Sequence, residues 1–163
     1  MEHFAMTQIS LDSIDRRILA ELQIDGRMTN VELANKVGLT APPCLRRVRT
    51  LEDAGVIEGY HATLNANQLG YAITVYAMVS LKSQAEADLR AFEEHVAKLD
   101  LVRECHMLNG EIDFILKIVA CDLQEFQLFL TTHLTPAPNV AGVKTSLTIR
   151  TSKHIPGVPV PAI

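Results

Sequence analysis

The chain has 163 residues, of which 48% are apolar, and its formal net charge at pH 7 is −4. This length and composition suffice for one well-packed hydrophobic core or two small ones, and the negative charge argues against a protein that coats nucleic acid by bulk attraction. No apolar run approaches the roughly 20 residues that span a bilayer, and residues 1–11 lack the apolar core of a signal peptide, so we expect a cytoplasmic protein with no membrane partner.

The cysteines are Cys44, Cys105 and Cys121, an odd number without any C-x-x-C spacing. This pattern argues against a disulfide framework and against a thiolate zinc site, and it favours buried thiols in a reducing compartment. We therefore expect no metal site and no tightly bound cofactor.

In chain order, the first structured segment is LDSIDRRILAELQID, residues 11–25. Its apolar residues recur at helical spacing, and Asp12 or Ser13 can cap its start. The residues that form the apolar face are Ile14, Ile18, Leu19 and Leu22. This helix is expected to cover the two helices that follow, which makes a three-helix unit.

Residues 28–59 predict two short helices joined by a tight turn. Thr29 and Glu32 form an S/T-x-x-E capping box for the first helix, and Thr40 is a second N-cap candidate. Gly38 between them can adopt a positive φ. The residues expected to be buried are Val31, Leu33, Ala34 and Val37 in the first helix and Cys44, Val48 and Leu51 in the second, which stops at Gly55.

The second of these helices carries the functional signal. At about 100° per residue its apolar stripe leaves Arg46 and Thr50 opposite, with Arg47 and Arg49 on the flanks. A solvated charged face is the ordinary interpretation, but the capped helix before it, the glycine turn and the absence of acids between Leu39 and Leu51 favour a helix-turn-helix that reads DNA. The expected DNA-contact residues are Thr29, Thr40, Pro42, Pro43, Arg46, Arg47 and Arg49.

We expect Arg46 to read a base edge and the two flanking arginines to hold phosphates. Pro42 and Pro43 fall in the first helical turn, where a missing N–H costs no intrahelical bond. An extended stretch, VIEGYHATL, follows the helix and makes the unit a winged-type one. The expected domain therefore spans 11–64, with an inter-domain linker at 65–70.

From Tyr71 the apolar period changes from helical to two, which predicts a strand. A helix with Leu89, Phe92 and Val96 inward follows it. VRECHMLNGEIDFILKIVA then predicts two strands joined by a hairpin at Asn109-Gly110. Asp122 is expected to cap a second helix, whose inward residues are Leu123, Phe126, Leu130 and Leu134, and VKTSLTIRTS is expected to form the last strand.

This order, βαββαβ, predicts an α+β chain with a ferredoxin-like sheet over residues 71–153 and both helices on one face. The strand from Ile112 is apolar on both sides, so the uncovered face needs a partner. We infer a homodimer joined through the sheet, which would place two helix-turn-helix units on a palindromic site in double-stranded DNA.

Three blocks, LDSIDRRIL, VGLTAPPCLRRVRTLEDAGVIEGY and NGEIDFILK, resemble the Lrp/AsnC, or feast/famine, transcription regulators in their expected order. The resemblance implies an N-terminal DNA-binding domain and a C-terminal domain that dimerises, builds higher assemblies such as an octamer and binds amino acids or related small-molecule effectors. The effector site that it implies consists of Asn109, Gly110, Glu111 and Asp113, facing Thr145, Leu147 and Thr148.

Two features depart from the family pattern: Asn139 stands where the family has glycine, and a Pro-rich tail occupies residues 154–163. From the residues alone, Asn109-Gly110 can also be a simple hairpin turn and Asp113 an ordinary acid at a strand edge. With the family context, Gly110 would let backbone N–H groups approach a carboxylate and Asp113 would accept bonds from an ammonium group.

Two other classes compete with a regulator: a small enzyme, and a metabolite-binding ferredoxin-like module without DNA binding. The catalytic candidates are Glu104, Cys105, His106, Glu111 and Asp113. On alternating strand positions Cys105 points away from His106, which makes a dyad geometrically poor, and the histidines show no metal-ligand spacing. The three-helix unit argues against a stand-alone module.

Overall fold

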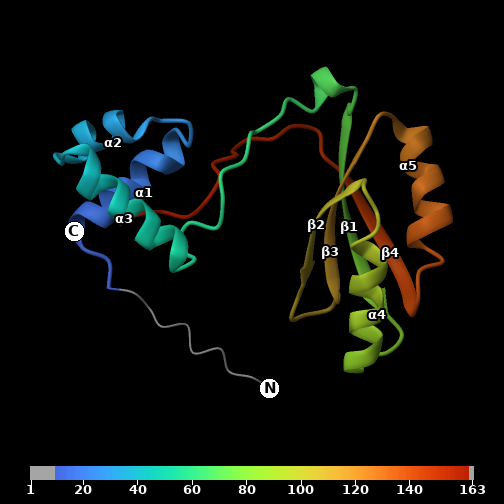
Figure 1. The fold of residues 1–163 in the computed structure, drawn as a ribbon. Coiled ribbons are helices and arrows are strands. Elements are labelled where there is room, and N and C mark those ends of the chain that lie inside the picture. The colour runs from blue at the N-terminus through green and yellow to red at the C-terminus, as the bar shows by residue number, and fades with distance from the viewer. Residues whose placement is uncertain (1–9, 162–163) are drawn as a thin grey trace. The chain divides into compact units, whose positions relative to one another are not determined.

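The computed structural model describes residues 10–161, which form two compact units. The first unit holds residues 10–63 together with 153–161, and the second is Leu64–Ser152. The helices and strands in chain order are α1 Ser13–Ile24, α2 Asn30–Val37, α3 Ala41–Asp53, β1 Ile73–Leu81, α4 Glu86–Val96, β2 Val102–Met107, β3 Phe114–Ala120, α5 Leu123–Phe129, which a π-helix at Leu130–Leu134 continues, and β4 Val140–Leu147 (Figure 1). The expected linker contains a 3-10 turn at Asn67–Leu69.

The three helices of the first unit begin where the sequence predicts, but their caps differ. Asp12 caps α1 and Thr29 caps α2, each through a complete capping box. Thr40 occupies the N-cap position of α3 without a capping hydrogen bond from its side chain. The reason is that an N-cap oxygen accepts from the second or third helical N–H, and Pro42 and Pro43 hold these two positions without an N–H.

The core of this unit confirms the predicted apolar stripes, with one exception. Gly38 closes α2 at φ 77°, and the seven buried residues are Ile18, Leu33, Ala34, Val37, Cys44, Val48 and Leu51. Val31, expected inside, is 60% exposed. It lies about 110° around the helix from the middle of the buried stripe on α2, so it faces away from α1 and α3.

Residues 153–161 pack within the first unit. Gln23 Nε2 in α1 donates a 3.0 Å hydrogen bond to the carbonyl of Val158, and Gly157 takes a positive φ of 77° beside it. The Pro-rich segment from Lys153 is thus grouped with the helices of the first unit. After α3, residues 56–64 form neither helix nor strand, so the expected wing is extended chain, and Tyr60 Oη donates to Glu52 Oε1 at 2.9 Å.

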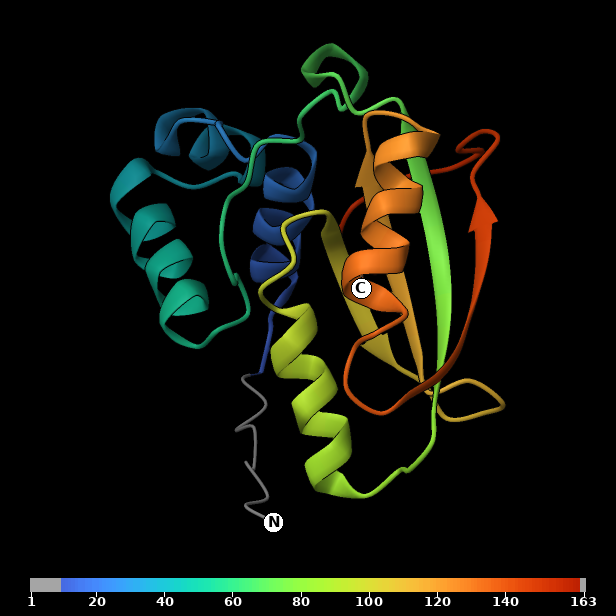
Figure 2. The ribbon, with the colours of Figure 1, turned by 90° about the vertical axis from the view of Figure 1, so that its right-hand side faces the viewer.

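The second unit is the predicted ferredoxin-like sheet. Its strands run in the order β2-β3-β1-β4 with antiparallel neighbours, and both α4 and α5 lie on one face (Figure 2). Alternate residues of β1 and β3 point toward these helices, where Phe92 of α4 meets Phe114 of β3 with ring centroids 4.8 Å apart. On the opposite face no helix of Leu64–Ser152 covers Tyr76, Ile115 and Val119.

Two predicted details of the connection between β2 and β3 are wrong. Asn109-Gly110 is not a two-residue hairpin, because a loop from Leu108 to Asp113 separates β2 from β3 and Gly110 takes no positive φ. The strand that follows begins at Phe114 instead of Ile112. Asp113 turns inward and bonds to β1, which removes it and Ile112 from the strand ladder.

Leu123, expected inward on α5, is 60% exposed, and Phe129 is buried in the core with Phe126. Side chains on a helix lean toward its N-terminus, so that of the first residue extends past the helix end. The last strand is Val140–Leu147 instead of 143–152. It ends there because β1 begins at Ile73 and offers no partner beyond the bond from Thr148 N to Thr74 O.

Asn139, which stands where the family has glycine, adopts a positive φ. Its φ is 63°, in the left-handed region that asparagine tolerates better than most residues. Its side chain Nδ2 donates to the carbonyl of Ser83 at 2.7 Å, and its own carbonyl accepts from Lys82 N at 2.8 Å. The departure from glycine thus keeps the turn and adds a hydrogen bond to it.

Candidate nucleic-acid interface and effector site

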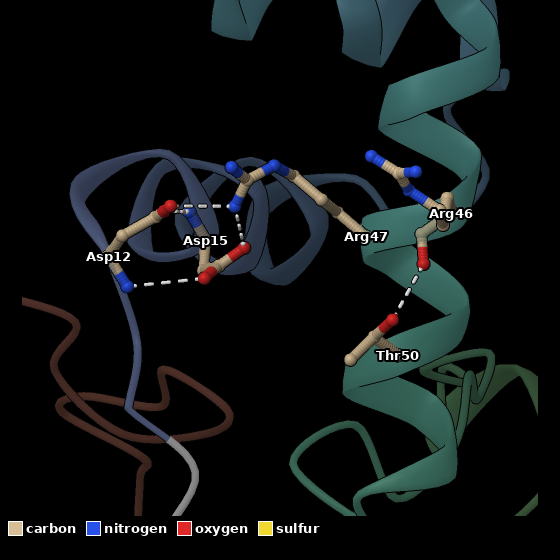
Figure 3. Close-up of polar contacts among 5 residues, drawn as sticks. All are labelled: Asp12, Asp15, Arg46, Arg47 and Thr50. Carbon is tan, nitrogen blue, oxygen red and sulfur yellow. Dashed lines mark hydrogen bonds and ion pairs between the residues drawn. The ribbon is translucent and has the colours of Figure 1, made fainter.

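The exposed face of α3 carries Arg46 and Arg49, as the sequence predicts. Within residues 10–161 neither guanidinium pairs with a carboxylate. Thr50 Oγ1 donates to the carbonyl of Arg46 at 2.9 Å (Figure 3). Two cations that are not neutralised by neighbours, on a helix held from behind by a buried stripe, suit the acidic surface of a duplex.

Arg47 does not lie on this face, which corrects the expectation of three outward arginines. Its Nη1 donates to Asp12 Oδ2 at 2.8 Å and to Asp15 Oδ1 at 2.7 Å, both at the start of α1 (Figure 3). The hydrogen bond to Asp15, and after it the one to Asp12, raises the pKa of Arg47 above its ordinary value. Sequence spacing could not show this, because it says nothing of how α3 packs on α1.

The two threonines expected at the DNA surface differ in their roles. Thr29 is committed to its capping box, with Oγ1 2.7 Å from Glu32 Oε2, whereas Thr40 is exposed at the start of α3. Pro42 is exposed beside it and Pro43 is half-buried. Asn30, which sequence reasoning missed, donates from Nδ2 to the carbonyl of Ala41 at 2.8 Å and so ties α2 to α3 across the turn. No pattern in the sequence marks it.

Three of the four expected effector residues of the β2–β3 loop, Asn109, Gly110 and Asp113, line a cavity of about 450 Å³. Its lining residues are Gln84, Leu89, Met107, Leu108, Asn109, Gly110 and Asp113. Apolar side chains form one part of the wall and amide groups another, which suits a small molecule with an apolar end and a polar end. Sequence reasoning missed the first four residues, because they come from α4, the loop before it and the end of β2.

Asp113 is the buried carboxylate of this site. It is 8% exposed, and its two oxygens accept from Leu81 N and from Gln84 Nε2, each at 2.7 Å. Its carboxylate therefore fixes the loop that carries Gln84 against the end of β1. Glu111, by contrast, is exposed.

The second half of the expected effector site lies elsewhere in the protomer. Asp113 N bonds to Val79 O, whereas Leu147 pairs with Val75 and Thr145 with Ala77, on the other side of β1. Four residues along a strand span about 13 Å. Within one protomer, Thr145, Leu147 and Thr148 therefore lie across β1 from the loop.

The catalytic candidates do not assemble into a recognisable constellation. His106 Nε2 lies 3.6 Å from Glu104 Oε2, and Lys117 Nζ lies 2.7 Å from Glu104 Oε1 and is the main cause that lowers the pKa of Glu104. Cys105 and Cys121 are exposed, which corrects the expectation of buried thiols for these two residues, and partial desolvation raises the pKa of Cys105 to about 11, away from thiolate chemistry. Within the described residues no three His, Cys, Asp or Glu side chains are grouped as a metal site, and no helix is long and apolar enough to cross a membrane.

Comparison with known proteins decides the family. Residues 74–158 match the Lrp/AsnC ligand binding domain, and residues 11–58 match a winged helix-turn-helix DNA-binding domain. The chain belongs to the Lrp/AsnC family. This Lrp/AsnC protein is a DNA-binding transcription regulator that responds to a small-molecule effector.

Its relatives share nearly the whole length of the chain. A leucine-responsive regulatory protein of Rhizobium meliloti (strain 1021) is 55% identical over 148 residues, which cover 91% of this chain and 95% of that protein. The Bkd operon transcriptional regulator of Pseudomonas aeruginosa is 42% identical over 140 residues, covering 86% and 92%. A transcriptional regulator from Neisseria meningitidis, solved as a complex with L-Met, has a TM-score of 0.88 at 34% identity, covering 92% of this chain and 97% of that chain.

Proposed function

We propose that this Lrp/AsnC regulator binds a palindromic operator as a homodimer, with α3 in the major groove and an amino acid as its effector. The observation that carries the DNA contact is the pair of exposed arginines, Arg46 and Arg49, on a helix whose opposite face is buried. Arg46 is central and suits a base edge, and Arg49 suits a phosphate. The protein acts through binding, without catalysis.

The effector part rests on the cavity beside the β2–β3 loop. Leu89, Met107 and Leu108 form a wall for an apolar side chain, and the loop at Asn109-Gly110 offers backbone and amide groups to a polar head. The Neisseria relative with L-Met and the leucine-responsive Rhizobium relative support an apolar amino acid as the ligand class. The side-chain amide of Gln84, held by Asp113, is a further polar group on the wall of this cavity.

The same effector would act by changing how the protomers assemble. Because residues 145–148 lie apart from the loop within one protomer, a ligand that touches both must sit between two protomers. The uncovered sheet face supports the homodimer, and an octamer would be built from such dimers. A ligand at such a contact changes DNA affinity only if it binds two assembly states unequally.

Two measurements test this function. Wild-type protein selects a duplex from a randomised pool, and thermal shifts are recorded with each of the twenty amino acids. We expect the selection to enrich a palindromic duplex. We expect the effector to stabilise the folded protein by about 2.7 kcal/mol when its concentration is a hundredfold above its Kd. The best amino acid should change affinity for the selected duplex by roughly 5- to 150-fold. An unenriched pool contradicts the operator, and a screen without any shift contradicts the amino-acid effector.

A further inference from the structure

Arg47 contacts the two carboxylates at the start of α1, Asp12 and Asp15, all four of whose oxygens accept hydrogen bonds. Asp12 Oδ1 accepts from Asp15 N at 2.8 Å and Asp15 Oδ2 accepts from Asp12 N at 3.1 Å, which completes the capping box of α1. The remaining oxygens, Asp12 Oδ2 and Asp15 Oδ1, both accept from Arg47 Nη1 (Figure 3). One guanidinium thus joins α3 to both acids of a cap on another helix.

The surroundings favour this contact over one with DNA. The Asp15 side chain is 13% exposed and that of Arg47 31%, so the pair is partly shielded from solvent. The backbone N–H of Asp15, followed by Arg47, holds the pKa of Asp12 below its ordinary value. With both acids ionised, the group of three side chains has a net charge of −1, which repels a phosphate instead of attracting it.

We propose that Arg47 is a positioning residue, which sets the orientation of α3 on α1 and does not contact DNA. Arg46 and Arg49 project from the same helix on either side of it, so a rotation or tilt of α3 moves both away from their places on the duplex. Two charge-assisted hydrogen bonds from Arg47 Nη1 to two carboxylates at the start of α1 resist such movement. This inference rests on the proposed contact of α3 with DNA.

The experiment uses full-length protein and two probes: the duplex selected by wild type and an unselected duplex of equal length. Affinities for both are measured over a series of KCl concentrations. The variants are Arg47→Gln, the double variant Asp12→Asn/Asp15→Asn, and their combination. Asparagine keeps an oxygen for each capping bond while it removes the charge that holds Arg47. Arg49→Gln is the matched control for a phosphate contact.

If Arg47 is a positioning residue, its loss should reduce the discrimination between the selected and the unselected duplex and leave the salt dependence of DNA affinity unchanged. Arg47→Gln should reduce the ratio of selected to unselected affinity by about tenfold and leave the slope of log affinity against log salt at the wild-type value. The double acid variant should lose the same ratio although Arg47 is intact, and the combined variant should lose no more. Arg49→Gln should weaken both probes alike and lower the slope by about 0.9.

Other outcomes overturn the proposal. A reduced slope in Arg47→Gln would mean that Arg47 holds a phosphate. An unchanged ratio in Arg47→Gln would mean that the bridge does not orient α3. If Arg47→Gln lowers the melting temperature, the double acid variant, which keeps its caps, supplies the same comparison. If Arg46→Ala and Arg49→Gln both bind like wild type, the proposed DNA contact of α3 fails, and the positioning role fails with it.

Discussion

Asp113 Oδ2 accepts a 2.7 Å hydrogen bond from the backbone N–H of Leu81, the last residue of β1. In the reverse direction along the same edge, Asp113 N donates to the carbonyl of Val79 at 3.0 Å. The acid therefore closes β1 and β3 together just past the end of their ladder. Asp113 therefore holds the β2–β3 loop against β1 whether or not a ligand is bound.

For this reason we expect Asp113→Ala to lower the free energy of unfolding by about 1–3 kcal/mol, since the buried N–H of Leu81 loses its partner. Urea unfolding measures the change. Glu111→Ala, at an exposed position of the same loop, should stay within about 0.5 kcal/mol of wild type. If Asp113→Ala keeps wild-type stability but no longer binds the effector, Asp113 instead contacts the ammonium group of the ligand.

At the DNA surface, Arg46→Ala should cost about 1–3 kcal/mol of binding free energy on the selected duplex and relax sequence preference at one base position. The physical reason is the loss of a bidentate donor to a base edge. Fluorescence anisotropy on single-base variants of the duplex locates the position. Arg90→Ala, whose guanidinium pairs with Glu86 on α4 in the other unit, serves as the control and should bind normally. Equal losses on every duplex would assign Arg46 to phosphate.

Acid should destabilise the helix caps of the first unit. The pKa of Asp12 is lowered chiefly by the N–H of Asp15, and that of Glu32 chiefly by the hydroxyl of Thr29. Groups with depressed folded pKa values bind fewer protons folded than unfolded, so their stabilisation is present above about pH 5 and is lost as the pH falls through the folded values. Urea midpoints measured from pH 6 downward should fall less in Asp12→Asn/Glu32→Gln than in wild type. Parallel curves for the two proteins would refute the assignment.

The uncovered sheet face supplies a test of the dimer. Ile115→Asp places a charge in the middle of that face, where a protein interface would have to desolvate it. Sedimentation velocity at micromolar concentration should then show monomers. Leu128→Asp, on the exposed side of α5, should remain dimeric. A dimeric Ile115→Asp protein would place the contact on another surface.

The Pro-rich end of the chain can be tested at Gly157. A Cβ there would lie 2.6 Å from Gln23 Oε1, and the residue has φ 77°. Gly157→Ala should therefore destabilise the protein by about 1 kcal/mol or more in urea unfolding. In a Gln23→Ala background, Gly157→Ala should destabilise the protein less, because the steric clash with Gln23 is gone and only the strain of the positive φ remains. Full stability of the single variant would show that the tail does not pack on α1.

Much of the fold could be predicted because its signals are local. A capping box needs only residues three apart, as at Thr29 and Glu32, and the alternation along β1 needs only one strand. The family blocks then placed these elements in order. The same local reasoning failed at Thr40, where the two prolines that favour the helix also remove the N–H groups that a cap requires.

The sequence by itself determined the three-helix unit, the βαββαβ order, the family and the exposed positions of Arg46 and Arg49. Only the tertiary structure decided which of three neighbouring arginines is neutralised, that Asp113 is committed to β1, and that Thr145 lies away from the effector loop. The physical reason is that periodicity specifies which side of an element is buried, whereas the partner of a polar side chain depends on the packing angle and strand register between elements distant in sequence.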